Sequence, residues 1–313
     1  MSSVSDLPAY FSMFGGMWID RPDWRQMAVA HGLSDEMIAM LARFIEDGYI
    51  VIEGAADTDV IDAFQAQIET SFRQGNPALL YQSHASHETM PLDGPVDRLG
   101  TRVVDCFVAL PDALKLFTSP RLIEFLTVVL GEKPLLFQSL SFDQGSQQGL
   151  HQDTAYVVVD RPMELVACWI ALEDVKEGSG ELMYVPGSHR LSELPFGGDR
   201  KHWDASVDGR EPHEEWARRL REQATSGPRG VERFLARKGD ILIWHADLAH
   251  GGAPVADPAL TRQSLVGHFC PVSARPRYFD FGPCRTTTHD YGPLAYASSH
   301  YDLSTIAPIS KEG

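Results

Sequence analysis

The residues with the clearest chemical potential are a histidine and an aspartate in the segment Leu150-His151-Gln152-Asp153-Thr154. If this segment is a strand, His151 and Asp153 point to the same face, because side chains alternate along a strand. An imidazole and a carboxylate side by side, joined by a second histidine, form a facial ligand set. That set suits iron(II) and leaves positions open for small molecules. A three-residue pattern recurs by chance, so this pair needs support from elsewhere in the chain.

That support comes from a second segment, Gly239 to Gly252, in which an apolar strand leads to His250 beside two glycines. Glycine lets another backbone or a ligand approach closely. Arg262 follows on the next predicted strand with Ser264 on its face, and the planar guanidinium of arginine binds a carboxylate through two parallel hydrogen bonds. His245 lies shortly before His250 and is the alternative ligand.

The remaining histidines carry weaker signals. His189 follows a Pro-Gly-Ser turn and is predicted to be structural. His268 shares the predicted strand face of Arg262 and could reach the same pocket, although a core histidine with a hydrogen-bond partner is the favoured interpretation. Four others lie in polar segments without a functional signal: His202, His213, His289 and His300.

Helical patterns dominate the first part of the chain. Ser34 is a predicted N-cap for a helix over 35–47 that Gly48 ends, and a short buried strand follows at 49–52. Two more helices are predicted over 57–72 and 119–130, the second with Ser119 as the cap and Pro120 in the first turn.

After Gly131 the pattern changes to short apolar runs separated by Gly, Pro and Asp. Such runs with turn signals predict strands of a sandwich or barrel. The fold class that we expect is mainly β with flanking helices, around a double-stranded β-helix (jelly roll, cupin-like) core. The runs cover residues 135–142, 155–159, 164–171, 181–185, 240–244 and 263–269.

We expect one domain over residues 1–313. Residues 1–132 form an N-terminal helical layer with short strands, 133–271 the jelly-roll core, and 272–313 a C-terminal tail. A polar insertion at about 190–230 is too long for a hairpin loop and is predicted to be a lid. Aromatic residues suit a closing lid, and packing of the tail on the outer sheet or on another subunit is the alternative. These aromatics are Phe196, Trp203 and Trp216 in the insertion, and Tyr278, Phe279, Phe281, Tyr291 and Tyr296 in the tail.

Composition limits the partners. A formal net charge of −16 repels phosphate backbones and anionic membranes, so we expect no nucleic acid and no membrane partner. The four cysteines lack metal-binding spacing, and no signal peptide or apolar membrane span is evident, which predicts a cytoplasmic protein with reduced thiols. The basic stretch from Arg218 to Lys238 has two interpretations. A solvated helix face followed by a loop is favoured about two to one over an anion-binding patch.

The segment from Leu33 to Pro271 resembles the phytanoyl-CoA dioxygenase family of iron(II)- and 2-oxoglutarate-dependent oxygenases. Three motifs carry the resemblance: LHQDT at 150–154, CWIALEDVKEGSGELMYVPGSHR at 168–190, and KGDILIWHADLAHGG at 238–252, followed by Arg262. The family often has serine where this chain has Gly252.

The resemblance implies that His151, Asp153 and His250 are the iron(II) ligands and the catalytic centre. Its co-substrates would be 2-oxoglutarate and O2, and the reaction would release succinate and CO2 while hydroxylating an unactivated C–H bond. Related halogenases lack the metal-binding carboxylate, so the intact Asp153 favours hydroxylation or a desaturation-like variant.

The resemblance also implies a co-substrate pocket. Arg262 matches the arginine that binds the distal carboxylate of 2-oxoglutarate, and Trp169 matches a tryptophan lining that pocket. Ser264 lies on the face of Arg262, and Arg102, in GTRVVDCF, falls near where some relatives place a lysine that reaches the same carboxylate.

Three functions therefore compete. The first is an oxygenase that acts on a small molecule such as a natural product, an acyl thioester or an amino-acid-like metabolite. The second is a jelly-roll metalloenzyme that does not use 2-oxoglutarate, against which Arg262 and Ser264 argue. The third is a non-catalytic metal- or ligand-binding relative. Formation of succinate from 2-oxoglutarate separates them, while the substrate and the oligomeric state stay open.

Overall fold

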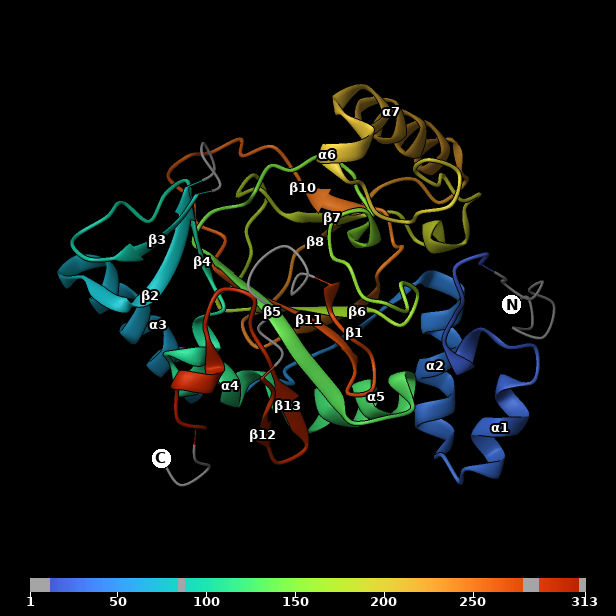
Figure 1. Ribbon diagram of the computed structural model, residues 1–313, viewed down its shortest axis with the longest axis horizontal. Coiled ribbons are helices and arrows are strands. Elements are labelled where there is room, and N and C mark those ends of the chain that lie inside the picture. The colour runs from blue at the N-terminus through green and yellow to red at the C-terminus, as the bar shows by residue number, and fades with distance from the viewer. Residues whose placement is uncertain (1–11, 84–87, 278–286, 310–313) are drawn as a thin grey trace.

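Two β-sheets face each other in the computed structural model, which describes residues 12–83, 88–277 and 287–309 (Figure 1). The large sheet has the strand order β1-β9-β6-β11-β5-β4-β2-β3, and the small sheet has the order β10-β7-β8. The strands of this order are β1 Tyr49–Ile52, β9 Ile241–His245, β6 Val166–Ala171, β11 Ser264–Pro271, β5 Pro134–Phe142, β4 Thr101–Val104, β2 Asn76–Ser83 and β3 Thr89–Leu92, and two further strands, β12 and β13, join the same sheet through β5. The small sheet consists of β10 His250–Gly252, β7 Leu182–Tyr184 and β8 Glu232–Phe234.

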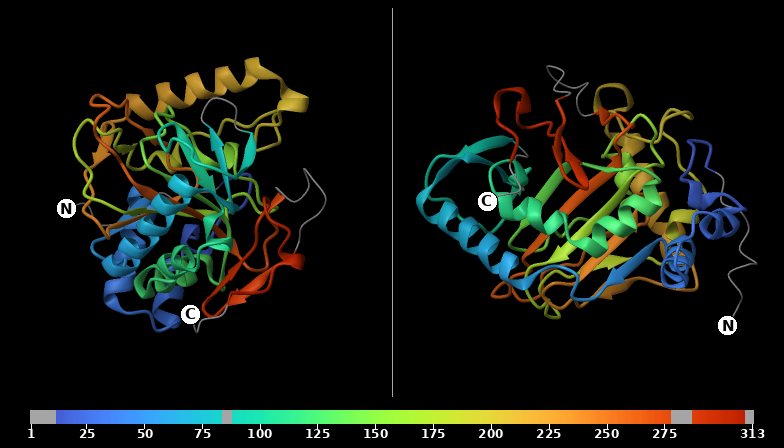
Figure 2. Two further views of the ribbon diagram at one scale, coloured as in Figure 1. Left: turned by 90° about the vertical axis from the view of Figure 1, so that its left-hand side faces the viewer. Right: turned by 90° about the horizontal axis from the view of Figure 1, so that it is seen from below.

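Helices cover only the outer face of the large sheet. In Figures 1 and 2 they lie on the side opposite the later helices α6 and α7. The covering helices are α1 Trp24–Ala30, α2 Asp35–Asp47, α3 Thr58–Gln74, α4 Pro111–Phe117 and α5 Pro120–Leu130. Their apolar faces join one core cluster with outward-facing strand residues such as Ile170, Ile243 and Phe269. The inner face of the large sheet is thus left for the small sheet and the functional residues.

Strand alternation separates the two layers. On β6, Ile170 packs in the helical core, whereas its neighbour Trp169 belongs to a second cluster between the sheets. On β9, Ile243 and Leu242 divide in the same way. Because the side-chain period is two, a slip of one residue would exchange the two faces.

Local signals explain several helix boundaries. The Ser34 hydroxyl accepts a hydrogen bond from the backbone N–H of Met37, as expected for an N-cap, and α2 ends at Gly48 with φ of 80°. A Cβ at Gly48 would also stand 2.4 Å from Nδ1 of His189. Ser119 differs from the prediction, because its hydroxyl donates to the carbonyl of Ala55 and does not cap α5.

The expected helical layer contributes more to the sheet than the sequence indicated. Strand β1 pairs with β9, and β2, β3 and β4 extend the large sheet beyond β5. The strand expected at 155–159 is wrong, because residues Asp153–Ala155 form a 3-10 helix, η4, and Val159 makes only an isolated bridge to Pro276. The other expected strands form close to their predicted bounds, and the jelly-roll core is confirmed.

The insertion folds into two helices, α6 Ala205–Asp208 and α7 Arg210–Ser226, above the small sheet in Figure 1. Trp216 and Leu220 on α7 and Phe196 before it pack in one cluster with Leu150 and Val185. The insertion is therefore packed on the segment that carries His151.

The tail divides into several parts. Strands β12 His289–Tyr291 and β13 Leu294–Tyr296 form a hairpin, and β13 pairs in parallel with β5. Tyr291 and Tyr296 are buried in the helical core, so this part packs on the sheet, as the alternative to a lid predicted. Three aromatics that the lid prediction used, Tyr278, Phe279 and Phe281, lie outside the described residues.

The structure also bears on membrane-spanning helices and on the cysteines. Within residues 12–83, 88–277 and 287–309, no helix combines the length and apolar character needed to cross a bilayer. Three cysteines of the described part are buried and unpaired with each other: Cys106, Cys168 and Cys270.

Candidate metal centre and adjoining pockets

The fold brings His151, Asp153 and His250 together. His151 and His250 face each other across a backbone bridge, in which each N–H donates to the other's carbonyl at 2.9 and 3.0 Å. The backbone N–H of Asp153 donates to the carbonyl of Ala246 at 2.8 Å, which brings η4 against the turn before β10. The candidate ligand atoms of the three residues all lie within 4.8 Å of one another, and all three residues lie below the surface.

Hydrogen bonds orient both imidazoles. Nδ1 of His151 donates to the carbonyl of Gly149, and Nδ1 of His250 donates to the carbonyl of Leu248, each at 2.9 Å. A carbonyl only accepts, so each Nδ1 carries a proton, and Nε2 is the ring nitrogen left to face a metal. The two Nε2 atoms lie 3.9 and 3.6 Å from Oδ1 of Asp153, so the three atoms face a common point.

The second carboxylate oxygen of Asp153 is held separately. Oδ2 accepts a hydrogen bond from the indole N–H of Trp244 at 2.8 Å, and Nε2 of His268 lies 3.6 Å from it. Burial opposes ionisation of Asp153, but His250 and His268 beside it hold the pKa of the carboxyl below its usual range. Burial, followed by His250, lowers the pKa of His151 to about 4. At neutral pH the site therefore presents a neutral imidazole at His151 and an anionic carboxylate at Asp153.

Asp247 fastens the loop that carries Asp153. Its carboxylate accepts the hydroxyl of Thr154 and pairs with Nζ of Lys201 from the insertion, both at 2.5 Å. Its carbonyl accepts the side-chain amide of Gln152 at 2.7 Å. Charged groups are rarely buried unless they are paired in this way. The ligand loop is thus tied both to the turn before His250 and to the insertion.

His245, the alternative ligand, lies outside this constellation. Its Nδ1 accepts the backbone N–H of Asp247 at 3.0 Å, and its ring lies 5.3 Å from that of His189. His189 is fixed in turn through Nε2 to the carbonyl of Ile45. Both histidines thus shape the turn behind the site, which agrees with the structural role predicted for His189.

A small pocket of about 80 Å³ adjoins the three candidate ligands. Arg262 and Trp169 line it, and the guanidinium carbon of Arg262 lies 5.5 Å from the Trp169 ring and 5.9 Å from the Phe142 ring. Arg262 precedes β11 instead of lying on it, and its backbone N–H donates to the carbonyl of Asp143. Burial lowers the pKa of Arg262 to about 10, so the side chain is still a cation at neutral pH.

Buried donors around this pocket lack protein partners. Within the described part of the chain, Nε of Arg262, Nε1 of Trp169 and Oγ of Ser264 are buried without a hydrogen bond. Ser264 does not line the pocket itself, but it lies on the β11 face of Val266 and His268, which do. Buried polar groups are normally paired, so these residue types fit a pocket whose ligand supplies acceptor oxygens.

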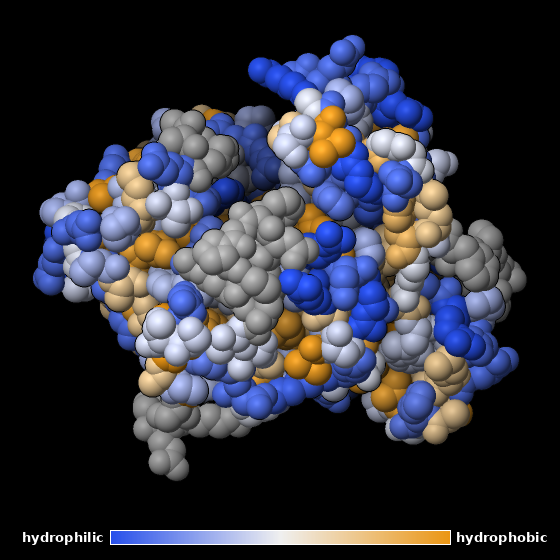
Figure 3. All heavy atoms as spheres, in the orientation of Figure 1, coloured by the Kyte–Doolittle hydropathy of each residue, from blue (hydrophilic) through white to orange (hydrophobic). Residues whose placement is uncertain are grey.

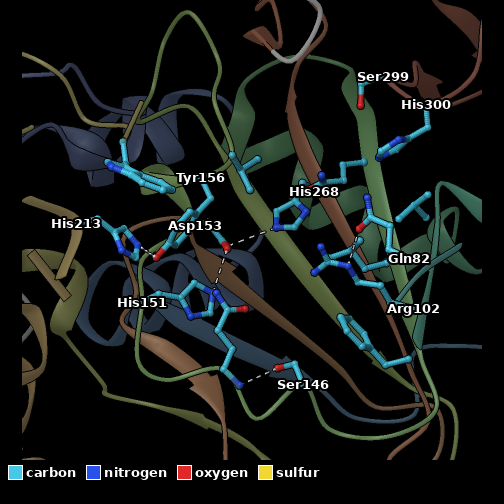
Figure 4. A pocket seen from close by; sticks show the side chains of 17 residues that line it. Gln82, Arg102, Ser146, His151, Asp153, Tyr156, His213, His268, Ser299 and His300 are labelled. Carbon is cyan, nitrogen blue, oxygen red and sulfur yellow. Dashed lines mark hydrogen bonds and ion pairs between the residues drawn. The ribbon is translucent and has the colours of Figure 1, made fainter. Parts of the chain in front are cut away.

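A larger cavity of about 720 Å³ also reaches the candidate ligands (Figure 4). Seven residues line both spaces: Leu140, Phe142, Ser146, Gln148, His151, Asp153 and His268. His268 therefore faces the site, and the favoured interpretation of a core histidine with a hydrogen-bond partner was wrong. Further lining residues that sequence reasoning missed are Gln82, Gln138, Tyr156, His213, Ser299 and His300.

Arg102 lines this larger cavity and is not among the described residues around the small pocket. Its Nε donates to Oε1 of Gln82 at 2.9 Å. Sequence reasoning placed Arg102 near the same carboxylate as Arg262, but the two arginines line different spaces. No pattern in the sequence indicates this separation, because it depends on how β4 joins the sheet beside β5.

Close backbone contacts explain why glycines follow His250. A Cβ at Gly251 would lie 2.5 Å from the carbonyl oxygen of Gln148, and one at Gly252 would lie 2.8 Å from the backbone nitrogen of Gln147. The close approach expected there is thus made by the chain's own loop before His151. A serine at position 252 requires that loop to move.

Part of the basic stretch near α7 is paired with carboxylates. Arg218 pairs with Glu215 and Glu222, and Arg229 pairs with Glu46 and Asp47. The face over α7 is mainly hydrophilic in Figure 3. The interpretation as a solvated helix face is therefore favoured over an anion-binding patch.

Comparison with known proteins agrees with this geometry. The family model for phytanoyl-CoA dioxygenase matches residues 44–263, which include both ligand segments and Arg262. The chain belongs to this family. The mouse peroxisomal phytanoyl-CoA dioxygenase is 26% identical over 219 residues, which cover 66% of this chain and 60% of that enzyme. Ectoine dioxygenase from Bordetella parapertussis is 25% identical over 237 residues, covering 71% and 70%.

The family fold extends to a solved structure of different chemistry. The epimerase SnoN, crystallised in complex with Fe3+, alpha ketoglutarate and nogalamycin RO, matches with a TM-score of 0.53 and 20% identity. The match covers 88% of this chain and 96% of SnoN, and it shows a common fold.

Proposed function

We propose that this chain is an iron(II)- and 2-oxoglutarate-dependent dioxygenase that hydroxylates an unactivated C–H bond of a small molecule. The observation that carries the proposal is the position of the candidate ligands beside two spaces: all three line the small one, and His151 and Asp153 also line the larger one. One space is small and holds a buried arginine, as a co-substrate with a carboxylate requires. The other is large enough for a separate organic substrate.

The donor set fits iron(II). Two neutral imidazole nitrogens and one carboxylate oxygen form the two-histidine, one-carboxylate facial arrangement that leaves coordination positions open. His151 and His250 would bind the metal through Nε2, because backbone carbonyls hold their Nδ1 protons. Trp244 donates to the other oxygen of Asp153 and so orients the carboxylate, which is the outer-shell support that metal sites require.

The small pocket fits 2-oxoglutarate. Arg262 would bind the distal carboxylate, and the buried Ser264 hydroxyl and Trp169 indole N–H would supply further donors. A buried cation without an anionic partner is costly, so a bound dicarboxylate also stabilises Arg262. When bound, the iron and this co-substrate supply the oxidative chemistry, in which O2 is consumed and succinate and CO2 are released.

The protein's own contribution is positioning and exclusion of water. Asp247 ties the ligand loop to Lys201 of the insertion, and Tyr156 and His213 close one side of the larger cavity. Together these contacts place one wall of the cavity on the insertion, which supports its role as a lid. The role of the tail as a lid and the cytoplasmic location stay predictions of the sequence.

The two alternatives receive less support. A metalloenzyme without 2-oxoglutarate leaves no purpose for the buried Arg262 and its neighbouring donors. A non-catalytic relative has no need to keep all three candidate ligands oriented as they are. The intact Asp153 favours hydroxylation, although SnoN shows that an epimerase shares the fold.

Succinate formation tests the proposal. Purified protein with iron(II), 2-oxoglutarate and O2 is expected to release succinate, and the same protein with zinc(II) is not. Arg262→Gln is the matched variant, since it keeps a polar side chain and removes the charge. Absence of succinate, together with absence of 2-oxoglutarate binding to the zinc protein by calorimetry, contradicts the proposal.

A further inference from the structure

Phe142 separates two arginines that serve two different spaces. Its ring lies beside Arg262 in the small pocket, and on the sheet Phe142 of β5 is the register partner of Arg102 of β4. Phe142 lines both spaces, whereas Arg262 and Arg102 each line one. The candidate metal centre thus has one guanidinium on the co-substrate side and another on the side of the larger cavity.

Arg102 is oriented by the strand next to its own. Gln82 of β2 is its register partner, and Oε1 of Gln82 accepts the hydrogen bond from Nε of Arg102. The amide nitrogen of Gln82 donates to the hydroxyl of Thr89 on β3 at 2.8 Å, so the carboxamide itself is fixed. Figure 4 shows Gln82 and Arg102 together on the side of the cavity away from Tyr156 and His213. An ordered guanidinium loses little freedom on binding, which favours recognition of a planar anion.

The adjoining part of the wall is also held from behind. Asp105 is fully buried and accepts hydrogen bonds from the Ser139 backbone N–H at 2.7 Å and from the Ser298 hydroxyl at 2.6 Å. The Ser298 hydroxyl in turn accepts the backbone N–H of His300 at 3.0 Å. Ser299 and His300 are thereby placed in the cavity wall as further polar groups near the Arg102 side.

The charge of the lining favours an anion. Among the described lining residues, the carboxylates are represented by Asp153 alone, which belongs to the candidate metal centre. The remaining ionisable lining residues are Arg102, the histidines and Tyr156, while Val104, Leu140 and Val157 add an apolar surface to the cavity. A volume of about 720 Å³ lies within the range of pockets that enclose compact ligands.

We propose that the substrate is a compact molecule with an apolar body and a carboxylate, which Arg102 binds at the side of the larger cavity away from the metal centre. Arg102 is then a specificity-determining residue for the substrate, distinct from Arg262 on the co-substrate. The inference rests on the proposed function in one respect, namely that the bound molecule is a substrate whose reacting carbon faces the metal centre. The binding of the carboxylate can be measured without turnover.

The test uses protein loaded with zinc(II) and saturating 2-oxoglutarate, so that the small pocket is filled and no reaction occurs. Ligand-observed NMR measures binding of matched probe pairs: phenylacetate with phenylacetamide, and cyclohexanecarboxylate with cyclohexanecarboxamide. Each acid is expected to bind about tenfold more tightly than its amide, because one charge-assisted contact is lost in the amide. Arg102→Met removes this preference, and Gln82→Leu reduces it.

Controls separate this inference from the proposed function. Arg43→Met, on the exposed face of α2, keeps the preference for the acids. Arg102→Met leaves the affinity for 2-oxoglutarate unchanged in calorimetry, whereas Arg262→Gln lowers it. Equal binding of acids and amides, no binding of any acid, or a loss of 2-oxoglutarate affinity in Arg102→Met overturns the inference. If the wild-type zinc protein fails to bind 2-oxoglutarate, the proposed function fails, and the acid preference is still measured in the same protein.

Discussion

The two spaces beside the candidate metal centre are built from different parts of the molecule. The small pocket lies between strands of the jelly-roll core, where Trp169, Trp244 and Val266 are buried. The larger cavity draws on added parts: Gln82 and Arg102 from the strands that extend the large sheet, His213 from the insertion and His300 from the tail. On the proposed function, binding of the co-substrate would depend on the jelly-roll core, and binding of the substrate on the additions around it. This division lets one fold keep its chemistry while the substrate changes.

The largest effect is expected at the centre that both spaces share. Asp153→Ala removes the one carboxylate of the candidate ligand set, and succinate formation should fall by about a thousandfold or more. Iron content of the purified variant should fall with it. Asp35→Ala, in the exposed first turn of α2, is the matched control and should keep the succinate formation and iron content of the wild type. Turnover retained in full by Asp153→Ala contradicts the assignment of the metal centre.

The choice between the two neighbouring histidines gives the next effect. His250→Ala should lose iron, whereas His245→Ala should keep stoichiometric iron and lose thermal stability, because His245 holds the Asp247 turn. Iron content per chain, measured beside the melting temperature, distinguishes the two. A His250→Ala protein with full iron beside an iron-free His245→Ala protein reverses the assignment.

The co-substrate side is tested by Arg262. Arg262→Ala should raise the KM for 2-oxoglutarate more than it changes iron affinity, since a charge-assisted contact contributes roughly 1–3 kcal/mol. The buried position of the guanidinium against Trp169 makes compensation by another cation difficult. Unchanged binding of 2-oxoglutarate means that another group holds its distal carboxylate. If Arg102→Met also weakened 2-oxoglutarate binding, Arg102 would bind the co-substrate, and the two arginines would not serve different ligands.

The substrate side is tested from the insertion. The Tyr156 hydroxyl and Nε2 of His213 lie 2.7 Å apart, so a hydrogen bond links the ligand loop to α7. His213→Phe should weaken binding of the acid probes by about three- to tenfold, the cost of one hydrogen bond, and leave the KM for 2-oxoglutarate unchanged. His289→Phe, on β12 away from the described cavity lining, is the control. Equal losses on both sides contradict a division of labour between core and insertion.

The smallest effect concerns the turn behind the site. Burial lowers the pKa of His245 to about 3, below its ordinary value of 6.5. Between these two values the unfolded chain is protonated at His245 and the folded chain is not. This contribution to stability is complete above pH 6.5 and declines as the pH falls toward 3. Burial raises the pKa of Asp20 to about 6, which acts in the opposite direction over part of this window. The difference between wild type and His245→Asn therefore isolates the histidine, and the melting temperature of the variant should fall less steeply below pH 6.5. Parallel curves contradict the prediction.

Removal of the tail no longer serves as a clean test of a lid. Truncation after residue 284 would remove part of the fold, because Tyr291 and Tyr296 belong to the helical core and β13 pairs with β5. The Ser298 hydroxyl also binds the buried Asp105. Single substitutions in the cavity wall test the function of this region without removing part of the core.

The sequence by itself determined the candidate metal centre, the helices over the outer face and most strands of the core. His151 and Asp153 could be predicted because an imidazole and a carboxylate at this spacing suit a metal ion, and Arg262 because a carboxylate needs a cation. The choice of His250 over His245 drew on the resemblance to the family. Apolar periodicity predicts which elements form, since it records which face of an element is buried.

Only the tertiary structure decided which residues share a space. His268, Tyr156 and His213 come to the cavity from a strand, a 3-10 turn and the insertion, and no local pattern marks them. Asp153 lies in η4 instead of the expected strand, because its backbone bonds to Ala246 and its neighbours bind Asp247. Arg102 and Arg262 face different spaces because β4 pairs with β5 and places Phe142 between them. Such long-range pairings depend on the whole sheet, and the sequence around each residue does not specify them.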